Sequence, residues 1–95
     1  MAAYLVMRIA IGDGDRWRQY REAVVPLIVK FGGRHVTGSG KVELLEGADD
    51  GRRIAMFEFP SMAAIRAFWD SPEYVPVKEL RRDAAILEAW AVPGA

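Results

Sequence analysis

The order of two hydrophobic periods along the chain restricts the fold more than any other feature of the sequence. Apolar residues first alternate, as in a strand, and then recur every three or four residues, as in an amphipathic helix. The same change of period returns in the second half of the chain. The expected elements are a strand over 3–11, a helix over 13–31, a hairpin of strands over 34–47 and 52–59, helices over 61–69 and 72–83, and a strand over 85–92.

This order predicts an α+β, ferredoxin-like βαββαβ fold, with a four-stranded antiparallel sheet and helices on one face. At 95 residues, the chain is expected to form one domain over 1–95. Glycines within the second strand predict a bulge or bend near Gly38–Gly40. In the ferredoxin-like order, the first strand lies between the third and the fourth. The face of the sheet away from the helices is left open.

The alternation of side chains along the strands predicts which residues lie on this open face. They are Tyr4, Val6, Arg8, Ile54, Met56, Glu58, Ile86, Glu88 and Trp90. So apolar a patch is oversized for a monomer. We therefore expect a homodimer through this face, with a closed or nearly closed α/β barrel between two sheets. Within it, Arg8 is expected to pair with Glu58 or Glu88.

The composition excludes several classes of function. Thirteen basic and thirteen acidic side chains cancel, so we expect neither nucleic acid nor a membrane surface as a partner. The absence of cysteine removes disulfides, thiolate catalysis and sulfur-ligated metals, and a single histidine cannot form an all-imidazole metal site within one subunit. We expect no metal and no cofactor. Without an export signal, the cytoplasm is the default expectation for the location.

Several segments resemble, in order and spacing, the family called domain of unknown function 1330, over almost the entire chain. The most specific are the EFPS segment, 58–61, and the SPEY segment, 71–74. The resemblance implies a ferredoxin-like subunit of the dimeric α/β barrel superfamily. Relatives in that superfamily include cofactor-free monooxygenases, lactone isomerases and heme-binding enzymes, but a shared fold does not fix function. Gly38 stands where the family usually has an arginine, so any contact of that arginine with an anionic ligand is missing here.

Three residues are candidates for acid–base or orienting roles, namely His35, Arg8 and Tyr74. Histidine titrates near neutral pH, although a strand-edge histidine bonded to backbone is the alternative. Arg8 with its glutamates would bind a carboxylate or a water, or form a structural ion pair. The aromatic residues near Trp69 and Tyr74 are either core or pocket wall. The expected ligand pocket is lined by Tyr4, Arg8, Met56, Glu58, Glu88, Trp90 and Tyr74.

Three functions are compatible with these features. The first is a homodimeric α/β-barrel protein that binds a small organic ligand, aromatic or carboxylate. The second is a cofactor-independent monooxygenase- or isomerase-like enzyme that uses His35, Arg8 or Tyr74. The third is a structural or interaction module without a ligand. A monomer in solution would contradict the first function, and a barrel filled by its own side chains would favour the third.

Overall fold

The computed structural model describes residues 1–37 and 41–95, and within them the chain forms four strands and three helices. The elements are β1 (Ala3–Ile11), α1 (Gly14–Lys30), β2 (Arg34–His35), β3 (Arg53–Phe59), α2 (Met62–Trp69), α3 (Tyr74–Glu79) and β4 (Ala85–Pro93). The strands form one sheet in the order β2-β3-β1-β4, with every neighbouring pair antiparallel. The predicted ferredoxin-like architecture is confirmed.

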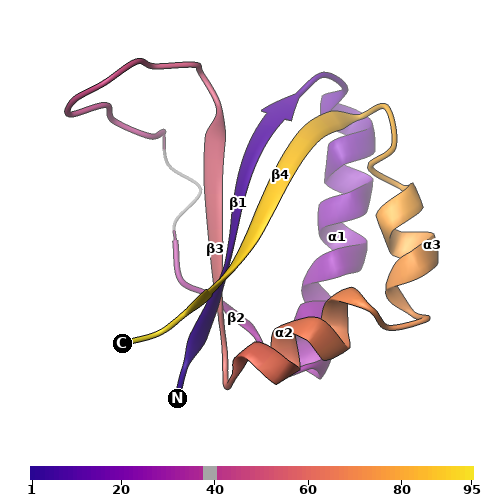
Figure 1. Cartoon of the computed structure of the whole chain (residues 1–95). Helices are drawn as coiled ribbons and strands as arrows, with labels where there is room; N and C mark the ends of the chain where they lie inside the picture. The colour runs from indigo at the N-terminus through magenta and orange to yellow at the C-terminus, as the bar shows by residue number, and fades with distance from the viewer. Residues whose placement is uncertain (38–40) are drawn as a thin grey trace.

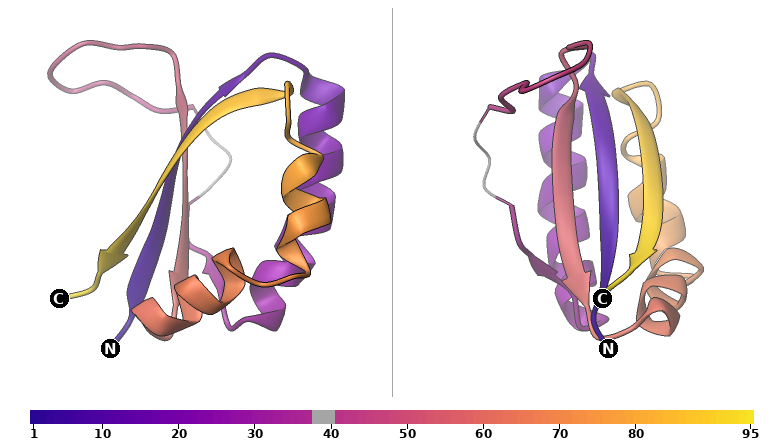
Figure 2. Two further views of the ribbon diagram at one scale, coloured as in Figure 1. Left: turned by 45° about the vertical axis from the view of Figure 1, so that its right-hand side comes forward. Right: turned by 60° about the vertical axis from the view of Figure 1, so that its left-hand side comes forward.

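The helices all lie on one face of the sheet (Figure 1). In the right-hand view of Figure 2, α1 lies behind the β3 side of the sheet, whereas α2 and α3 lie behind β4. The hydrophobic core fills the space between these two layers. Its largest fully buried side chains are Tyr20, Ile28, Phe59, Ile65, Phe68 and Tyr74. Among the residues described, no helix covers the other face of the sheet.

Helix α1 begins and ends where the sequence pattern predicts. The Asp13 side chain accepts a hydrogen bond from the Arg16 amide at 3.2 Å, which satisfies one of the free amides of the first turn. At the other end, Gly32 has a φ of 91°, in the left-handed region that glycine adopts without strain. Its amide donates to the Val29 carbonyl at 3.0 Å. The chain then turns directly into β2.

The expected strand over 34–47 is wrong for most of its length. β2 contains two residues, which pair with Glu58 and Phe57 of β3. Residues 41–52, here called the arm, contain no strand. In Figure 1, the arm extends away from the sheet on the side opposite the helices. The expected bulge near Gly38–Gly40 lies outside the described residues.

Turn-forming residues explain why the arm does not join the sheet. The side chains of Asp49 and Asp50 accept hydrogen bonds from the amides of Gly51 at 2.8 Å and Arg52 at 3.1 Å. Local bonds of this kind compete with the backbone ladder of a strand. Gly51 also has a φ of 71°, in the left-handed region. The arm keeps its large apolar side chains in solvent, and these are Val42, Leu44 and Leu45.

The last helix is shorter than the expected span of 72–83. Helix α3 ends at Glu79, and turns follow it. The N-cap residue of α3, Glu73, makes no side-chain cap bond, but the Ser71 hydroxyl accepts a hydrogen bond from the Tyr74 amide at 3.2 Å across the turn that leads into the helix. Asp83 has a φ of 62°, which an α-helix does not accommodate. Between Glu79 and Asp83 the chain runs through turns, with bonds such as that from the Arg82 amide to the Glu79 carbonyl at 3.1 Å, and it then reverses into β4.

Gly33 occupies a position without room for a side chain. A Cβ atom there would lie 2.5 Å from Ile28 Cγ2 and 2.8 Å from Phe59 Cζ, and both side chains are fully buried. Since a packed core cannot easily move aside, we expect Gly33→Ala to lower the free energy of unfolding by about 1–3 kcal/mol, measured by urea denaturation. Gly14→Ala is the control, since a Cβ there meets nothing within 4 Å. Equal losses in both variants would contradict this explanation.

Candidate functional site

The open face of the sheet carries the residues that strand alternation predicts. The backbone register sets them in cross-strand rows, Glu58 beside Tyr4, Met56 and Trp90 on either side of Val6, and Ile54 and Glu88 on either side of Arg8. Ile86 is 67% exposed, and Ile54 and Trp90 are each 42% exposed. The residues that alternate with them on β1, such as Met7, are buried against the helices. The expected division of the two faces is correct, and one of them is largely apolar and uncovered.

Arg8 does not pair with either glutamate that the sequence suggests. Its guanidinium forms an ion pair with Asp50 of the arm, and Glu88 forms one with Arg52. The Arg52 amide is the main cause that lowers the pKa of Asp50, and the Arg8 guanidinium lowers it further. The expected pairing is wrong because the arm, which the strand pattern does not reveal, brings its own charges to this end of the sheet.

Glu58 also has partners other than Arg8. Its Oε1 accepts a hydrogen bond from Arg34 Nε at 2.9 Å, and its Oε2 accepts one from the Tyr4 hydroxyl at 3.3 Å. The register of β2 explains the first contact, because Arg34 lies directly opposite Glu58. The acid of the EFPS segment is therefore paired across the sheet edge.

Tyr74 lies in the core and not on the open face. It is 1% exposed, and its hydroxyl lies 2.8 Å from the hydroxyl of Tyr20 in a buried hydrogen bond. Burial, and then the neighbouring Tyr74, raises the pKa of Tyr20, so this phenol stays protonated. The Tyr74 ring also packs against Phe68 and Trp69, with centroid distances of 4.7 and 5.3 Å. Tyr74 is therefore core, and the structure separates it from the other expected pocket residues.

His35 lies on the helix side of the sheet, the face opposite Arg8. It pairs with Phe57, and the two rings stack with centroids 4.6 Å apart and an interplanar angle of 19°. Its Nε2 lies 3.4 Å from the Thr37 hydroxyl. The sheet therefore stands between His35 and Arg8. Within one subunit, these two candidates do not act on the same ligand.

A cleft opens beside His35, between α1 and the helix-facing side of β1 and β3. Its volume is about 400 Å³, within the range of roughly 300–1,000 Å³ that is usual for small-molecule sites. Its apolar lining is Met7, Ile9, Ile11, Trp17, Tyr20, Val24, Val25, Ile54, Ala55 and Phe57, and its polar lining is Arg21, His35, Thr37 and Arg53. The cleft thus combines apolar walls with a basic and hydrogen-bonding rim.

The cleft is lined by residues of β3 that lie beyond the paired part of β2. β2 pairs with Phe57 and Glu58. Within the described residues, the outer edge of β3 over 53–55 has no partner strand. In this register, residues 37–39 would face 53–55, and 38 and 39 lie outside the described residues.

Arg21 and Arg53 line the cleft but are not among the site residues expected from the sequence. Two signals point to them. Arg53 has the same strand parity as Ala55 and Phe57, so its side chain belongs to the helix side of the sheet. Arg21 follows Trp17 by four residues, so both lie on one face of α1. Neither signal indicates a ligand site unless it is also known that a cleft opens between α1 and β3.

Metal sites and membrane-spanning helices can also be looked for in the described residues. Among residues 1–37 and 41–95, no three His, Asp or Glu side chains gather as the ligands of a metal ion would. In the same part of the chain, no helix combines the length and hydrophobicity that a membrane span requires.

The chain is similar to a described family and to several solved structures. The sequence pattern of the family described as "Domain of unknown function (DUF1330)" matches residues 2–95. SnoaB from Streptomyces nogalater, a cofactor-independent oxygenase, is 15% identical, with a TM-score of 0.73 over 99% of this chain and 93% of that chain. RPA0582 from Rhodopseudomonas palustris, a protein of unknown function, is 17% identical, with a TM-score of 0.75 over 99% of this chain and 82% of that one.

A putative antibiotic biosynthesis monooxygenase from Nitrosomonas europaea is more distant, at 14% identity and a TM-score of 0.56 over 97% of this chain and 89% of that one. At such identities, these likenesses establish the fold alone. No curated protein matches the chain in sequence.

Proposed function

Since the chain belongs to the DUF1330 family, whose description names no activity, we propose that it binds a small organic molecule in the cleft between α1 and β3. One observation carries the proposal. A cavity of about 400 Å³ with apolar walls and a few polar groups opens to solvent beside His35, which is the usual composition of a ligand site. Trp17, Tyr20 and Phe57 line it with aromatic rings, so a flat apolar ligand suits it best.

The test is a titration with 2-naphthamide, a flat and uncharged probe, followed through the backbone amide resonances of the ¹⁵N-labelled protein. We expect shifts at residues that line the cleft, such as Val24 and Ala55, and none at open-face residues such as Val6 and Ile86. Shifts confined to the open face would contradict the proposed place of the ligand. No shifts at millimolar probe would contradict ligand binding and favour a structural or interaction module.

A cofactor-independent enzyme of the oxygenase or isomerase kind is the second candidate function. His35 favours it, because an imidazole, the side chain that most often serves as a general acid or base, stands at the rim of an apolar cleft. The likeness of the fold to SnoaB adds an analogy. With 1-naphthol as the probe, an oxygenase would consume dioxygen and release naphthoquinone and water. We expect His35→Asn to slow that uptake by about 100-fold, and uptake no faster than in buffer would exclude this activity for the probe.

We also propose that a second copy of the chain covers the open face. The chain exposes 6306 Å², roughly 800 Å² more than the ~5,500 Å² typical of a compact monomer of its 10.6 kDa mass. That excess is about the area that each partner buries in a standard interface, ~800 Å². The subunit is also flat, with extents of 33 × 32 × 18 Å. A flat slab with one uncovered apolar face becomes compact when two such faces meet.

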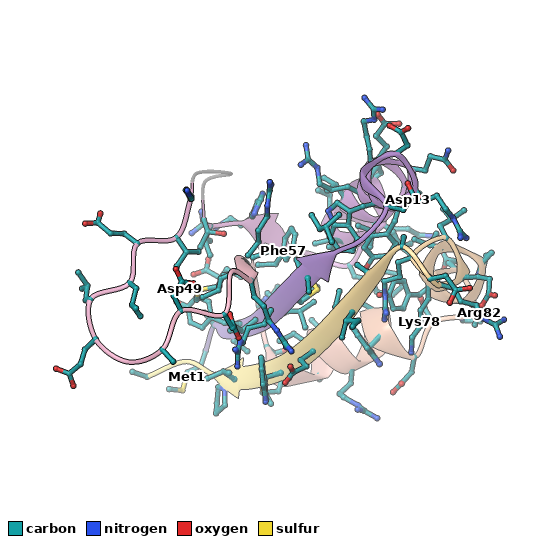
Figure 3. All side chains as sticks on the ribbon, turned by 90° about the horizontal axis from the view of Figure 1, so that it is seen from above. Met1, Asp13, Asp49, Phe57, Lys78 and Arg82 are labelled. Carbon is teal, nitrogen blue, oxygen red and sulfur yellow. The ribbon has the colours of Figure 1, made fainter. Side chains whose placement is uncertain are left out.

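Charges on the open face do not oppose this assembly. Glu58 pairs with Arg34, and the ion pairs of Arg8 and Glu88 with the arm neutralise the other end of the face. A second copy would therefore cover paired charges and not isolated ones. The arm carries Leu45, which is 91% exposed. In Figure 3, Asp49 of the arm lies on one side of the sheet, and Lys78 and Arg82 lie on the other. The arm is therefore on the side where the second copy would lie.

Light scattering of the purified protein at micromolar concentration tests the assembly. We expect twice the mass of the 10.6 kDa chain. A monomer at that concentration would contradict the proposed dimer and leave the ligand cleft standing, because all the residues that line the cleft come from one subunit.

A further inference from the structure

We propose that the cleft selects ligands which carry a carboxylate, and that Arg21 and Arg53 bind this group. The inference rests on the proposed function, since it names the ligand class of the same cleft. A second hollow of about 460 Å³ adjoins the cleft. The residues that line both are Ile9, Ile11, Trp17, Arg21 and Arg53. The two guanidiniums therefore stand where the two hollows meet.

Arg21 and Arg53 come from two elements on opposite sides of the cleft. Arg53 lies opposite Ile9 in the register of β3 and β1, and Ile9 is buried under the helices. Residues opposite each other in a sheet project to the same side, so Arg53 also projects toward α1. Arg21 follows Trp17 by about one helical turn and lines the cleft with it. A ligand in the cleft would meet both arginines.

Neither guanidinium has a carboxylate partner within residues 1–37 and 41–95. Arg18 is different, because it pairs with Asp15 at 2.8 Å. In the same described residues, no Asp or Glu lines either hollow. The chain as a whole is neutral, so this opening is a local excess of positive charge. Two like charges at one opening repel each other, and a bound anion would remove that repulsion.

The ligand that fits these contacts is a monocarboxylate with a flat apolar body. Two guanidiniums can donate parallel hydrogen bonds to one carboxylate, which is the geometry that arginine recognises best. Below them, Trp17, Val24 and Phe57 offer apolar walls that would contact the rest of the molecule. A polyphosphate ligand would leave charge against these walls without hydrogen-bond partners, so it fits worse.

Binding of 2-naphthoate and 2-naphthamide to the intact protein, measured by calorimetry, tests the inference. The two probes have nearly the same shape and differ in charge. We expect the acid to bind roughly tenfold more tightly or better, because hydrogen bonds to charged groups are the strong ones. This advantage is expected to shrink as salt is added. In the Arg21→Gln, Arg53→Gln double variant, the acid should lose its advantage while the amide binds as before.

Arg18→Gln is the matched control, because that arginine lines the second hollow but is already paired. It should keep the preference for the acid. Equal affinities of acid and amide for the intact protein would overturn the carboxylate inference and leave the ligand cleft standing. Failure of both probes to bind would also overturn the proposal that the cleft binds a ligand. A preference that persists in the double variant would overturn the assignment to Arg21 and Arg53. Arg21 and Arg53 are exposed residues, so we expect the double variant to fold. The comparison of acid and amide on the intact protein does not depend on any variant.

Discussion

Ile86→Glu combined with Trp90→Glu is expected to convert the proposed dimer into a monomer that keeps its fold. Both residues are exposed in the subunit, at 67% and 42%, so charge there costs the isolated chain little. In the dimer, the same carboxylates would be removed from water without partners, which costs several kcal/mol. Each 1.4 kcal/mol changes a dissociation constant by a factor of ten, so we expect the dissociation constant of the dimer to rise by at least ~1,000-fold. Sedimentation equilibrium measures this change directly.

Val75→Glu is the control for this prediction. Val75 is an equally exposed apolar residue, at 68%, but it lies on α3, on the other side of the sheet. Its substitution should leave the association unchanged. A double variant of Ile86 and Trp90 that remains dimeric would show that the open face is not the interface. Dissociation by Val75→Glu would move the interface to the helices.

Patterns that depend on near neighbours predicted most of the fold. Alternation in β1 separates Met7 from Arg8, and the structure places these residues on opposite faces of the sheet. The helix expected over 61–69 begins at a serine, a residue that favours the N-cap position, and the Ser61 hydroxyl accepts a hydrogen bond from the Ala64 amide at 3.1 Å. In both cases, the information lies within a few residues, because strand parity and helix capping are local properties.

Features that depend on the path of the arm could not be predicted in the same way. The ion-pair partner of Arg8 lies 42 residues further along the chain, at Asp50. Many carboxylates have suitable chemistry, and only the path of the arm selects one. The ion pairs of the open face thus depend on where Asp50 and Arg52 of the arm lie. The cleft likewise joins segments far apart in the chain, since residues of α1 and β3 line it together.

Tyr74 shows a different kind of difficulty. Its position after Ser71 and Pro72 is typical of a helix start, and a tyrosine there is equally compatible with a pocket wall or with the core. The partner that decides between them is Tyr20, whose hydroxyl lies 2.8 Å away but 54 residues earlier in the chain. Burial of a phenol requires such a partner. The sequence contains both tyrosines but not their contact.

Ala55→Phe is expected to close the cleft without unfolding the protein. Ala55 lines the cleft and lies on β3, where an aromatic residue is well tolerated. Its phenyl ring would occupy the space that 2-naphthamide needs. Forcing both rings into one cavity costs about 1–3 kcal/mol, so the affinity for the probe should fall on the order of 10- to 100-fold. Calorimetry gives the affinity, and thermal unfolding reports on the fold.

The sheet offers a matched control in Ala89→Phe. Met7 lies between Ala55 and Ala89 in one cross-strand row, but Ala89 lines a small hollow beside Trp69 and not the cleft. The same substitution there should leave probe binding unchanged, and equal losses in both variants would contradict the assigned cleft.

The cleft and the open face are expected to respond independently to these substitutions. Closing the cleft at Ala55 should leave the proposed dimer intact, because Ala55 lies on the helix side of the sheet, and charging Ile86 and Trp90 should leave probe binding intact, because neither residue lines the cleft.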